Sequence, residues 1–220
     1  MPCLIRRMCR EDISQVTEID REAFPTMWPP ANYNRELEIG LAHYIVASKK
    51  DEAVQIPGII TAAEEIFPLY PESVQQRSNH PSPTARVETA SGYRQHLVGF
   101  AGLWVMADEG HITNIAVREI YRRQGIGEQL LITLLKLATK QNTNNIILEV
   151  RVSNDKAQRL YIKYGFRGLG IRPKYYTDNS EDALVMGVDN ISGTQFQGCL
   201  SRLEKAYTEK WGIPPGNIIR

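Results

Sequence analysis

Between residues 113 and 166 the hydrophobic and polar positions predict strands and helices in a regular order. An apolar strand ends near Val117, and from Ile126 onward apolar residues recur at helical spacing over about four turns. After a polar run, residues 146–150 read as a buried strand. The order is strand, loop, helix, strand, and a right-handed crossover makes the two strands parallel neighbours.

A second helix is expected directly after this unit. Ser153, Asn154 and Asp155 are helix-capping residues, and Gly165 stands where a helix end favours glycine. The apolar positions between them are Ala157, Leu160, Tyr161 and Tyr164. This helix is expected to pack near the loop that precedes Ile126.

The N-terminal part of the chain adds further strands and helices. Residues 4–7, 44–48 and 96–105 are predicted to be strands, and residues 12–23 and 32–41 to be helices. Between the last two strands lies an insertion of about 45 residues, a length that in a compact domain indicates a mobile or a functional segment. We place this insertion at about 50–94. Within it, residues 59–67 fit a strand or a helix equally well.

The C-terminal residues 191–220 form an extension in which four apolar residues keep helical spacing: Phe196, Leu200, Leu203 and Tyr207. That helix could dock on the core or on a second subunit. The sequence therefore predicts an α/β domain over residues 1–190, with a mixed central sheet flanked by helices and a long insertion. A helical C-terminal extension follows it.

Composition narrows the class of protein. The chain has 220 residues and a net charge of +1, from 26 Lys and Arg against 25 Asp and Glu, so it lacks the broad charge of a nucleic-acid or membrane binder. No stretch reaches the roughly 18 apolar residues of a membrane span. Three cysteines without a pattern fit reduced thiols in the cytoplasm, and four histidines show no metal-ligand spacing, so we expect no metal.

The loop from Arg122 to Gly127 is the strongest candidate for a binding site. A helix start presents unpaired backbone N–H groups and the positive end of the helix dipole, which attract an anion. Gly125 and Gly127 allow close approach to the backbone, and Arg122 and Arg123 add positive charge. The spacing fits neither a P-loop nor the dinucleotide fingerprint, and it matches R-x-x-G-x-G. The plain alternative is an ordinary strand-to-helix turn with solvated arginines.

Glu149 is the candidate general base. Alternation along the strand 146–150 places it on the face opposite Leu148 and Val150, and a carboxylate in such an apolar run is costly to bury. Burial is expected to raise its carboxyl pKa toward neutrality, which suits a base that deprotonates an ammonium group directly or through water. The alternative is a surface-facing glutamate on a half-exposed strand.

Several segments in order along the chain resemble the GNAT N-acetyltransferases, and in particular the ribosomal-protein-alanine N-acetyltransferases (RimI type). The loop from Arg122 to Gly127 resembles the acyl-CoA pyrophosphate loop of that family. Residues 148–166, L-E-V-R-V-S-N-D-K-A-Q-R-L-Y-I-K-Y-G-F, carry the closest resemblance to the RimI type. Similar matches are T-N-I-A-V at 113–117, A-F-P at 23–25 with Trp28, and the Tyr175–Tyr176 pair followed by E-D-A-L-V-M at 181–186.

The resemblance implies a GNAT acyltransferase fold that binds acetyl-CoA between splayed strands. It implies Glu149 as the base and Tyr161 as the acid, because a phenol is protonated at neutral pH and can protonate the leaving thiolate. A purely packing role is the alternative for Tyr161. A backbone N–H of the 115–117 strand would stabilise the oxyanion. The expected cofactor-binding residues are Ile115, Ala116, Val117, Arg122, Arg123, Gln124, Gly125, Ile126, Gly127, Glu128, Asn154 and Tyr161.

Two of these assignments leave alternatives open. Asn154 could bond the pantetheine of the cofactor or hold the start of its helix. Four aromatic residues could line the acceptor peptide or simply cover the edge of the core: Phe24, Trp28, Tyr175 and Tyr176.

The implied function is acetyl transfer to the N-terminal α-amino group of a protein, and a ribosomal protein is the expected acceptor. The segments that resemble the acceptor site depart from the family pattern at Met27, Pro29 and Thr177. Acetylation of small amines or lysine side chains is therefore a rival expectation. A non-catalytic acyl-CoA sensor is another, although retention of both Glu149 and Tyr161 argues against it.

Overall fold

The structure is a computed structural model that describes residues 3–25, 31–55, 93–212, 214–215 and 218–219. The strands of this part of the chain are β1 (Cys3–Arg7), β2 (Ala42–Gln55), β3 (Tyr93–Met106), β4 (Glu109–Val117), β5 (Asn145–Arg151), β6 (Arg167–Tyr176), β7 (Glu181–Val188) and β8 (Ile218–Ile219). Its α-helices are α1 (Ile13–Ala23), α2 (Tyr33–Glu38), α3 (Ile126–Lys140), α4 (Asp155–Lys163) and α5 (Thr194–Trp211).

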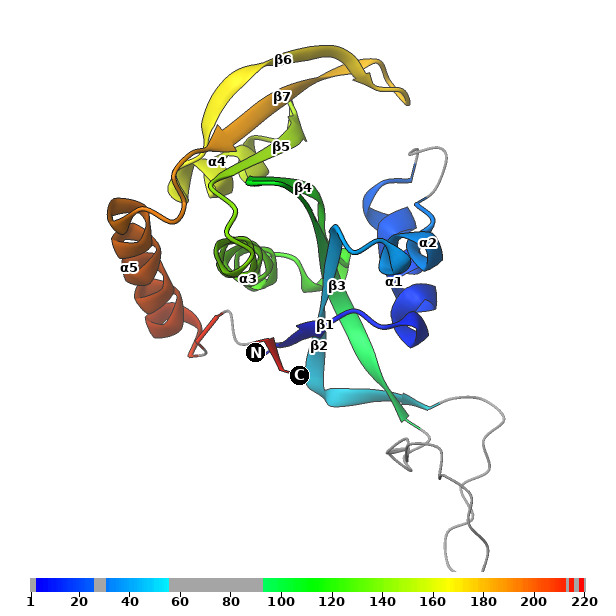
Figure 1. Ribbon diagram of the computed structural model, residues 1–220. Helices are drawn as coiled ribbons and strands as arrows, with labels where there is room; N and C mark the ends of the chain where they lie inside the picture. The colour runs from blue at the N-terminus through cyan, green and yellow to red at the C-terminus, as the bar shows by residue number, and fades with distance from the viewer. Residues whose placement is uncertain (1–2, 26–30, 56–92, 213, 216–217, 220) are drawn as a thin grey trace, which may run out of the picture.

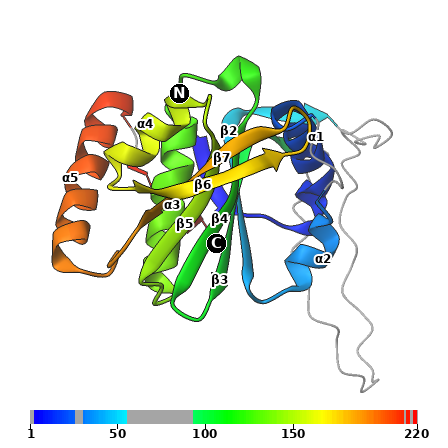
Figure 2. The ribbon, with the colours of Figure 1, turned by 90° about the horizontal axis from the view of Figure 1, so that it is seen from above.

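The strands of the described residues form one mixed sheet in the order β6-β7-β5-β4-β3-β2-β1-β8 (Figure 1). The pairs β4–β5 and β1–β8 are parallel and the other neighbours are antiparallel. Helices α1 and α2 lie on one side of the sheet, and α3, α4 and α5 lie on the other (Figure 2). The expected α/β fold, with a mixed sheet flanked by helices, is confirmed.

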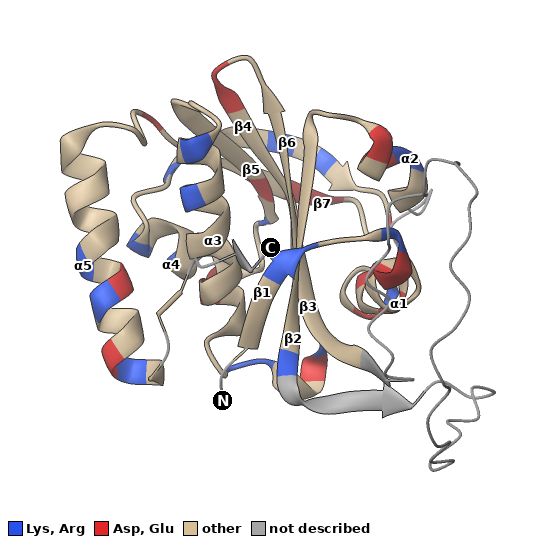
Figure 3. Ribbon diagram, turned by 60° about the horizontal axis from the view of Figure 1, so that its bottom comes forward, with Lys and Arg blue, Asp and Glu red and all other residues tan. Residues whose placement is uncertain are grey.

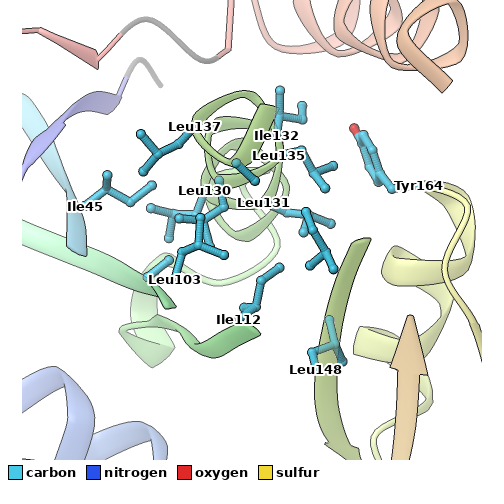
Figure 4. Packing of buried hydrophobic residues seen from close by; sticks show 14 of the residues in the cluster. Ile45, Leu103, Ile112, Leu130, Leu131, Ile132, Leu135, Leu137, Leu148 and Tyr164 are labelled. Atoms are coloured by element: carbon cyan, nitrogen blue, oxygen red, sulfur yellow. The ribbon is translucent and has the colours of Figure 1, made fainter. Parts of the chain in front are cut away.

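The main hydrophobic core lies between the sheet and α3. The apolar face of α3 is fully buried, as the helical spacing predicts, through Leu130, Leu131, Leu134, Leu135 and Ala138. Leu103, Ile112 and Leu148 face this helix from three neighbouring strands (Figure 4). A fully buried leucine stabilises the fold by about 2 kcal/mol, so this layer holds the start of α3 firmly against the strands.

The C-terminal extension docks on the same core. Leu200 and Tyr207 of α5 are buried with the main cluster, and Phe196 and Leu203 pack against it. The helix therefore covers its own domain, which answers whether it docks on the core. Acidic and basic residues alternate along α5 instead of gathering by sign (Figure 3).

The described elements differ from the sequence prediction in their lengths. Helix α2 ends at Glu38 because Ile39 takes an extended conformation, and the Leu41 carbonyl then accepts a bond from Val105 N. Strands β2 and β3 run further than predicted, to Gln55 and from Tyr93. Most of the expected insertion, including residues 59–67, lies outside the described residues.

Strands β4 and β5 separate partway along their length. Their parallel pairing runs from Glu109 with Asn145 to Ile112 with Leu148, and no further pairing of the two is present in the described structure. Beyond that point β4 stays paired with β3 as far as Val117, and β5 stays paired with β7 as far as Arg151. The backbone of β4 therefore has an edge not paired with β5 just before the loop that leads to α3.

Candidate active site

The loop at the start of α3 has the backbone of an anion site. Gly125 is the N-cap residue and has a left-handed conformation (φ 82°), and Arg123 also has a positive φ of 65°. Among the described residues, no side chain caps this helix start. The first N–H groups of α3 consequently have no side-chain acceptor and can bind an external anion.

The two glycines of the loop serve different purposes. A Cβ on Gly127 would have open space before it, with Val117 Cγ2 its nearest neighbour at 3.8 Å. A Cβ on Gly125 would instead come 2.6 Å from Trp211 Cε2. The open space before Gly127 fits the close approach of an anion, and Gly125 has two further reasons to be glycine: its left-handed backbone angle and its contact with Trp211.

The side chains of the loop also divide into two groups. Arg122 and Arg123 are exposed, and Arg122 Nε donates to Val117 O at 3.1 Å, which holds its guanidinium beside the end of β4. Gln124 donates to Ile120 O. The Glu128 carboxylate accepts a hydrogen bond from the Tyr164 hydroxyl at 2.7 Å and thereby ties α3 to the end of α4.

Glu149 lies where strand alternation predicts. Leu148 and Val150 are buried on one face of β5, and the Glu149 side chain, which is only 6% exposed, lies on the other. Its Oε2 is 2.6 Å from His111 Nε2. Its Oε1 is 2.9 Å from Arg172 Nη1, close enough for an ion pair but without the angles of a hydrogen bond.

These partners reverse the expected direction of the Glu149 pKa. The hydrogen bond from His111 lowers the pKa of the carboxyl group, and the charge of Arg172 adds to this against the opposing effect of burial. The expectation that burial raises this pKa toward neutrality is therefore wrong. At neutral pH Glu149 is an ionised, paired carboxylate.

Sequence reasoning missed His111 as a site residue. It lies on β4 opposite Ile147 of β5, one residue before the last pair of the two strands, Ile112 with Leu148. Its side chain is 26% exposed, so the ring lies between the buried carboxylate and the surface. The alternation of β4 could have placed His111 on the same sheet face as Glu149 once the two strands were taken as parallel neighbours.

Tyr161 lies in the last turn of α4, partly buried, with its ring 5.8 Å from that of Phe166. Burial, with a smaller effect of nearby Tyr176, raises the pKa of Tyr161 to about 12. The phenol therefore keeps its proton throughout the neutral range. Asn154 caps the same helix, because its Oδ1 accepts from Ala157 N at 3.2 Å, so the helix-holding alternative describes its contact in this structure.

The aromatic residues expected at the acceptor side are only partly brought together. Tyr175 and Tyr176 meet edge to face at 5.2 Å, and the Arg151 guanidinium lies 3.9 Å above the Tyr176 ring. Phe24 ends α1 and packs on the hydrophobic cluster of that side of the sheet. The β6–β7 hairpin extends toward that side as well (Figures 1 and 2). Trp28 lies outside the described residues.

A protein of Bacillus subtilis (strain 168), provisionally named a ribosomal protein bS18-alanine N-acetyltransferase, is 34% identical to this chain over 185 residues. The match covers 84% of this chain and 93% of that protein. The chain belongs to the acetyltransferase (GNAT) family. The profile of this family matches residues 59–166. This GNAT enzyme is an acetyl-CoA-dependent N-acetyltransferase, as its motifs predict.

One further relative agrees with the family assignment, and one solved structure shows the same fold. The ribosomal protein bS18-alanine N-acetyltransferase of Escherichia coli (strain K12) is 42% identical over 94 residues, which cover 42% of this chain and 64% of that protein. The crystal structure of the ribosomal-protein-S18-alanine N-acetyltransferase from Escherichia coli has the same fold. It superposes with a TM-score of 0.61 at 23% identity, over 86% of this chain and 94% of that one.

Two structural findings bear on the expectations from composition. None of the helices in the described ranges is long and apolar enough to span a membrane. Across the same residues, His, Cys, Asp and Glu side chains form no group of three that could hold a metal ion.

Proposed function

We propose that this N-acetyltransferase acetylates the N-terminal α-amino group of a protein, and that a ribosomal protein is its acceptor. The observation that carries the proposal is the paired Glu149 carboxylate beside the point where β4 and β5 separate. The relatives in Bacillus subtilis and Escherichia coli are named for alanine acetylation of a ribosomal protein, which supports this class of acceptor.

The residues of the loop fit acetyl-CoA. The uncapped start of α3 offers N–H groups to a pyrophosphate, Gly127 leaves the space before them open, and Arg122 and Arg123 add positive charge. The unpaired edge of β4 offers backbone groups from Ile115 to Val117 to an amide-bearing chain. When bound, acetyl-CoA supplies the thioester from which the acetyl group is transferred.

The proton chemistry falls to this chain's own side chains. The α-ammonium of a peptide must lose a proton before its nitrogen can attack, and the Glu149 carboxylate with its His111 partner forms the candidate accepting group. Tyr161, with its pKa of about 12, holds a proton at Oη that it can give to the departing sulfur. We assign the catalytic roles to Glu149 and Tyr161 on these grounds.

The acceptor class is tested by following the release of free thiol from acetyl-CoA. The probes are a peptide with a free N-terminal alanine, the same peptide with a blocked N-terminus and an internal lysine, and a small polyamine. Turnover of the first alone is expected. Turnover of the lysine peptide alone or of the polyamine alone would contradict the proposed N-terminal acceptor. Binding of acetyl-CoA without turnover of any probe would instead indicate a non-catalytic sensor.

A further inference from the structure

Arg151, the last residue of β5, is the centre of a hydrogen-bond network that binds the turn between β6 and β7. Its Nη2 donates to both carboxylate oxygens of Asp178, at 3.0 and 2.9 Å. Its Nη1 donates to Asn179 Oδ1 at 3.1 Å and to Glu181 Oε2 at 3.0 Å. The other oxygen of Glu181 accepts from Ser153 N at 2.9 Å, so the turn is also bonded to the backbone that follows β5.

The face of the same guanidinium lies on an aromatic ring. The carbon at its centre is 3.9 Å from the centroid of Tyr176. Tyr176 is paired with Glu181 across the hairpin, so Arg151 contacts both residues of this pair, one through its face and one through its edge. Among the charged side chains only arginine combines these contacts, because its planar group stacks on a ring while it donates within its own plane.

Backbone pairing alone does not fix this part of the hairpin. The register of β6 against β7 shifts between Arg172 and Tyr176, and within this shift Lys174 has a positive φ of 51°. The Lys174 N–H donates to the side chain of Asp182 at 2.8 Å instead of to a strand carbonyl. The Arg151 contacts therefore hold the hairpin beyond the point where its regular pairing is interrupted.

The tyrosine pair that these contacts support lies near both proposed catalytic side chains. Tyr175 and Tyr176 meet edge to face at 5.2 Å, and Tyr175 is 42% exposed. Burial raises the pKa of Tyr175, and the charge of Glu149 adds to this effect. Burial also raises the pKa of Tyr161, and nearby Tyr176 adds to that. The two rings therefore lie where an acceptor must pass to reach the base and the acid.

We propose that Arg151 is a positioning residue for the acceptor, and that it holds Tyr175 and Tyr176 in place as one wall of the acceptor site. The occupant of that site is an extended peptide N-terminus, whose amide groups and first side chain can contact the tyrosine hydroxyls and rings. This inference rests on the proposed function and adds the group that shapes the acceptor side. Arg151 acts through the tyrosines and needs no contact of its own with either substrate.

The kinetic test uses Arg151→Met, which keeps an unbranched apolar side chain and removes every donor. At saturating acetyl-CoA, KM for the acceptor peptide should rise about tenfold while kcat changes less than about threefold. The dissociation constant for acetyl-CoA should be unchanged. Arg151→Lys keeps the charge but loses the planar group, so it should recover only part of the lost affinity.

Arg167→Met is the matched control for the loss of one arginine from the hairpin region. Arg167 forms an ion pair with Asp189 and is paired with Gly187, at the opposite end of the hairpin from the turn. This variant should retain the wild-type KM for the peptide. An unchanged KM in Arg151→Met as well would overturn the proposal. Equal losses in peptide KM, kcat and acetyl-CoA affinity would also overturn it, because they would indicate a general loss of structure.

A double variant tests whether Arg151 acts through Tyr176. In a Tyr176→Ala background, adding Arg151→Met should raise KM by less than about threefold, because the ring that the guanidinium holds is already gone. A full tenfold rise in both backgrounds would contradict the positioning role, since Arg151 would then contribute independently of the ring.

A measurement without either substrate separates this inference from the acceptor class. Lys174 is exposed and directly precedes the tyrosine pair, so trypsin can cleave after it when the hairpin opens locally. Cleavage after Lys174, followed by mass spectrometry, should be about tenfold faster in Arg151→Met than in the wild type or Arg167→Met. Equal rates would refute the role of Arg151 even if peptide N-termini are acetylated. Faster cleavage in an enzyme whose wild type acetylates only the lysine peptide or the polyamine would overturn the acceptor class alone.

Discussion

The indole ring of Trp211 lies against the Cα of Gly125, where a Cβ would come 2.6 Å from Cε2 and 2.8 Å from Nε1. One turn earlier in α5, the Tyr207 hydroxyl donates to Gly125 O at 3.3 Å. The end of α5 therefore fixes the backbone of the residue at which α3 begins. This contact makes the C-terminal extension part of the support of the cofactor loop.

Gly125→Ala is expected to destabilise the protein by about 2–3 kcal/mol, because a left-handed alanine is strained and its methyl group would collide with Trp211. Urea unfolding measures this change. Gly127→Ala is the matched control: its methyl group meets no close protein atom, so stability should hold while acetyl-CoA affinity falls. Equal stability of the wild type and Gly125→Ala would contradict the contact.

Trp211→Ala should loosen the loop without touching any group that bonds the cofactor. We expect the dissociation constant of acetyl-CoA to rise about tenfold, equivalent to about 1.4 kcal/mol, with kcat at saturation little changed. Isothermal titration calorimetry measures the affinity. Glu209→Ala, an exposed change in the same turn, is the control, and an affinity equal to wild type in Trp211→Ala would show that the packing does not support the loop.

Arg122→Ala combined with Arg123→Ala should weaken acetyl-CoA binding by about tenfold or more, because two positive charges are lost beside the anion site. Both side chains are exposed, so the wild-type affinity should also fall with added salt, and more steeply than in the double variant. Arg202→Ala, an exposed arginine of α5, controls for net charge. Identical salt dependence in the wild type and the double variant would remove the arginines from the site.

Tyr161→Phe should lower kcat about 100-fold while sparing acetyl-CoA affinity, because the ring packing on Phe166 is kept and only the acid is lost. With a pKa of about 12, Tyr161 should cause no loss of wild-type activity on the alkaline side until pH approaches that value. Stopped-flow and steady-state kinetics test both points. Tyr164→Phe, which loses the bond to Glu128, should retain kcat and cost about 1 kcal/mol of stability.

Asp12 and Arg6 form a part-buried ion pair with contacts of 2.6 and 2.8 Å. Burial alone would raise the pKa of Asp12, but the hydrogen bonds from Arg6 and Cys9 outweigh it and lower the pKa. The stabilisation is therefore complete above the ordinary carboxyl value of about 3.9 and is lost as pH falls through the lower folded value.

Asp12→Asn should accordingly lower the free energy of unfolding by about 3 kcal/mol at neutral pH, and the variant's stability should change less between neutral and acid pH than that of the wild type. Free energies of unfolding measured in urea between neutral and acid pH give both quantities. Asp155→Asn, at a carboxylate that is 70% exposed, should leave the curve almost unchanged. If the free energy of unfolding fell equally with decreasing pH in the wild type and in Asp12→Asn, the acid sensitivity would belong to another group.

Local patterns were enough to predict the elements that carry the site. The alternation from residue 146 to 150 predicted which face of β5 bears Glu149, and the helical spacing after Ile126 predicted the buried face of α3. The pKa direction of Glu149 could not be predicted locally, because it depends on His111 and Arg172, which other strands bring to it. For the same reason, the dependence of Gly125 on Trp211 could not be predicted: a residue's neighbours in space are set by the fold.

The contact between α5 and Gly125 also has a consequence for folding during translation. The cofactor loop emerges from the translating ribosome long before Trp211 and Tyr207, the residues that hold it. A nascent chain that has already formed β4 and α3 would therefore present an unsupported loop. Full affinity for acetyl-CoA should therefore be reached only after α5 has been synthesised and has docked. A chain truncated before α5 should bind acetyl-CoA weakly.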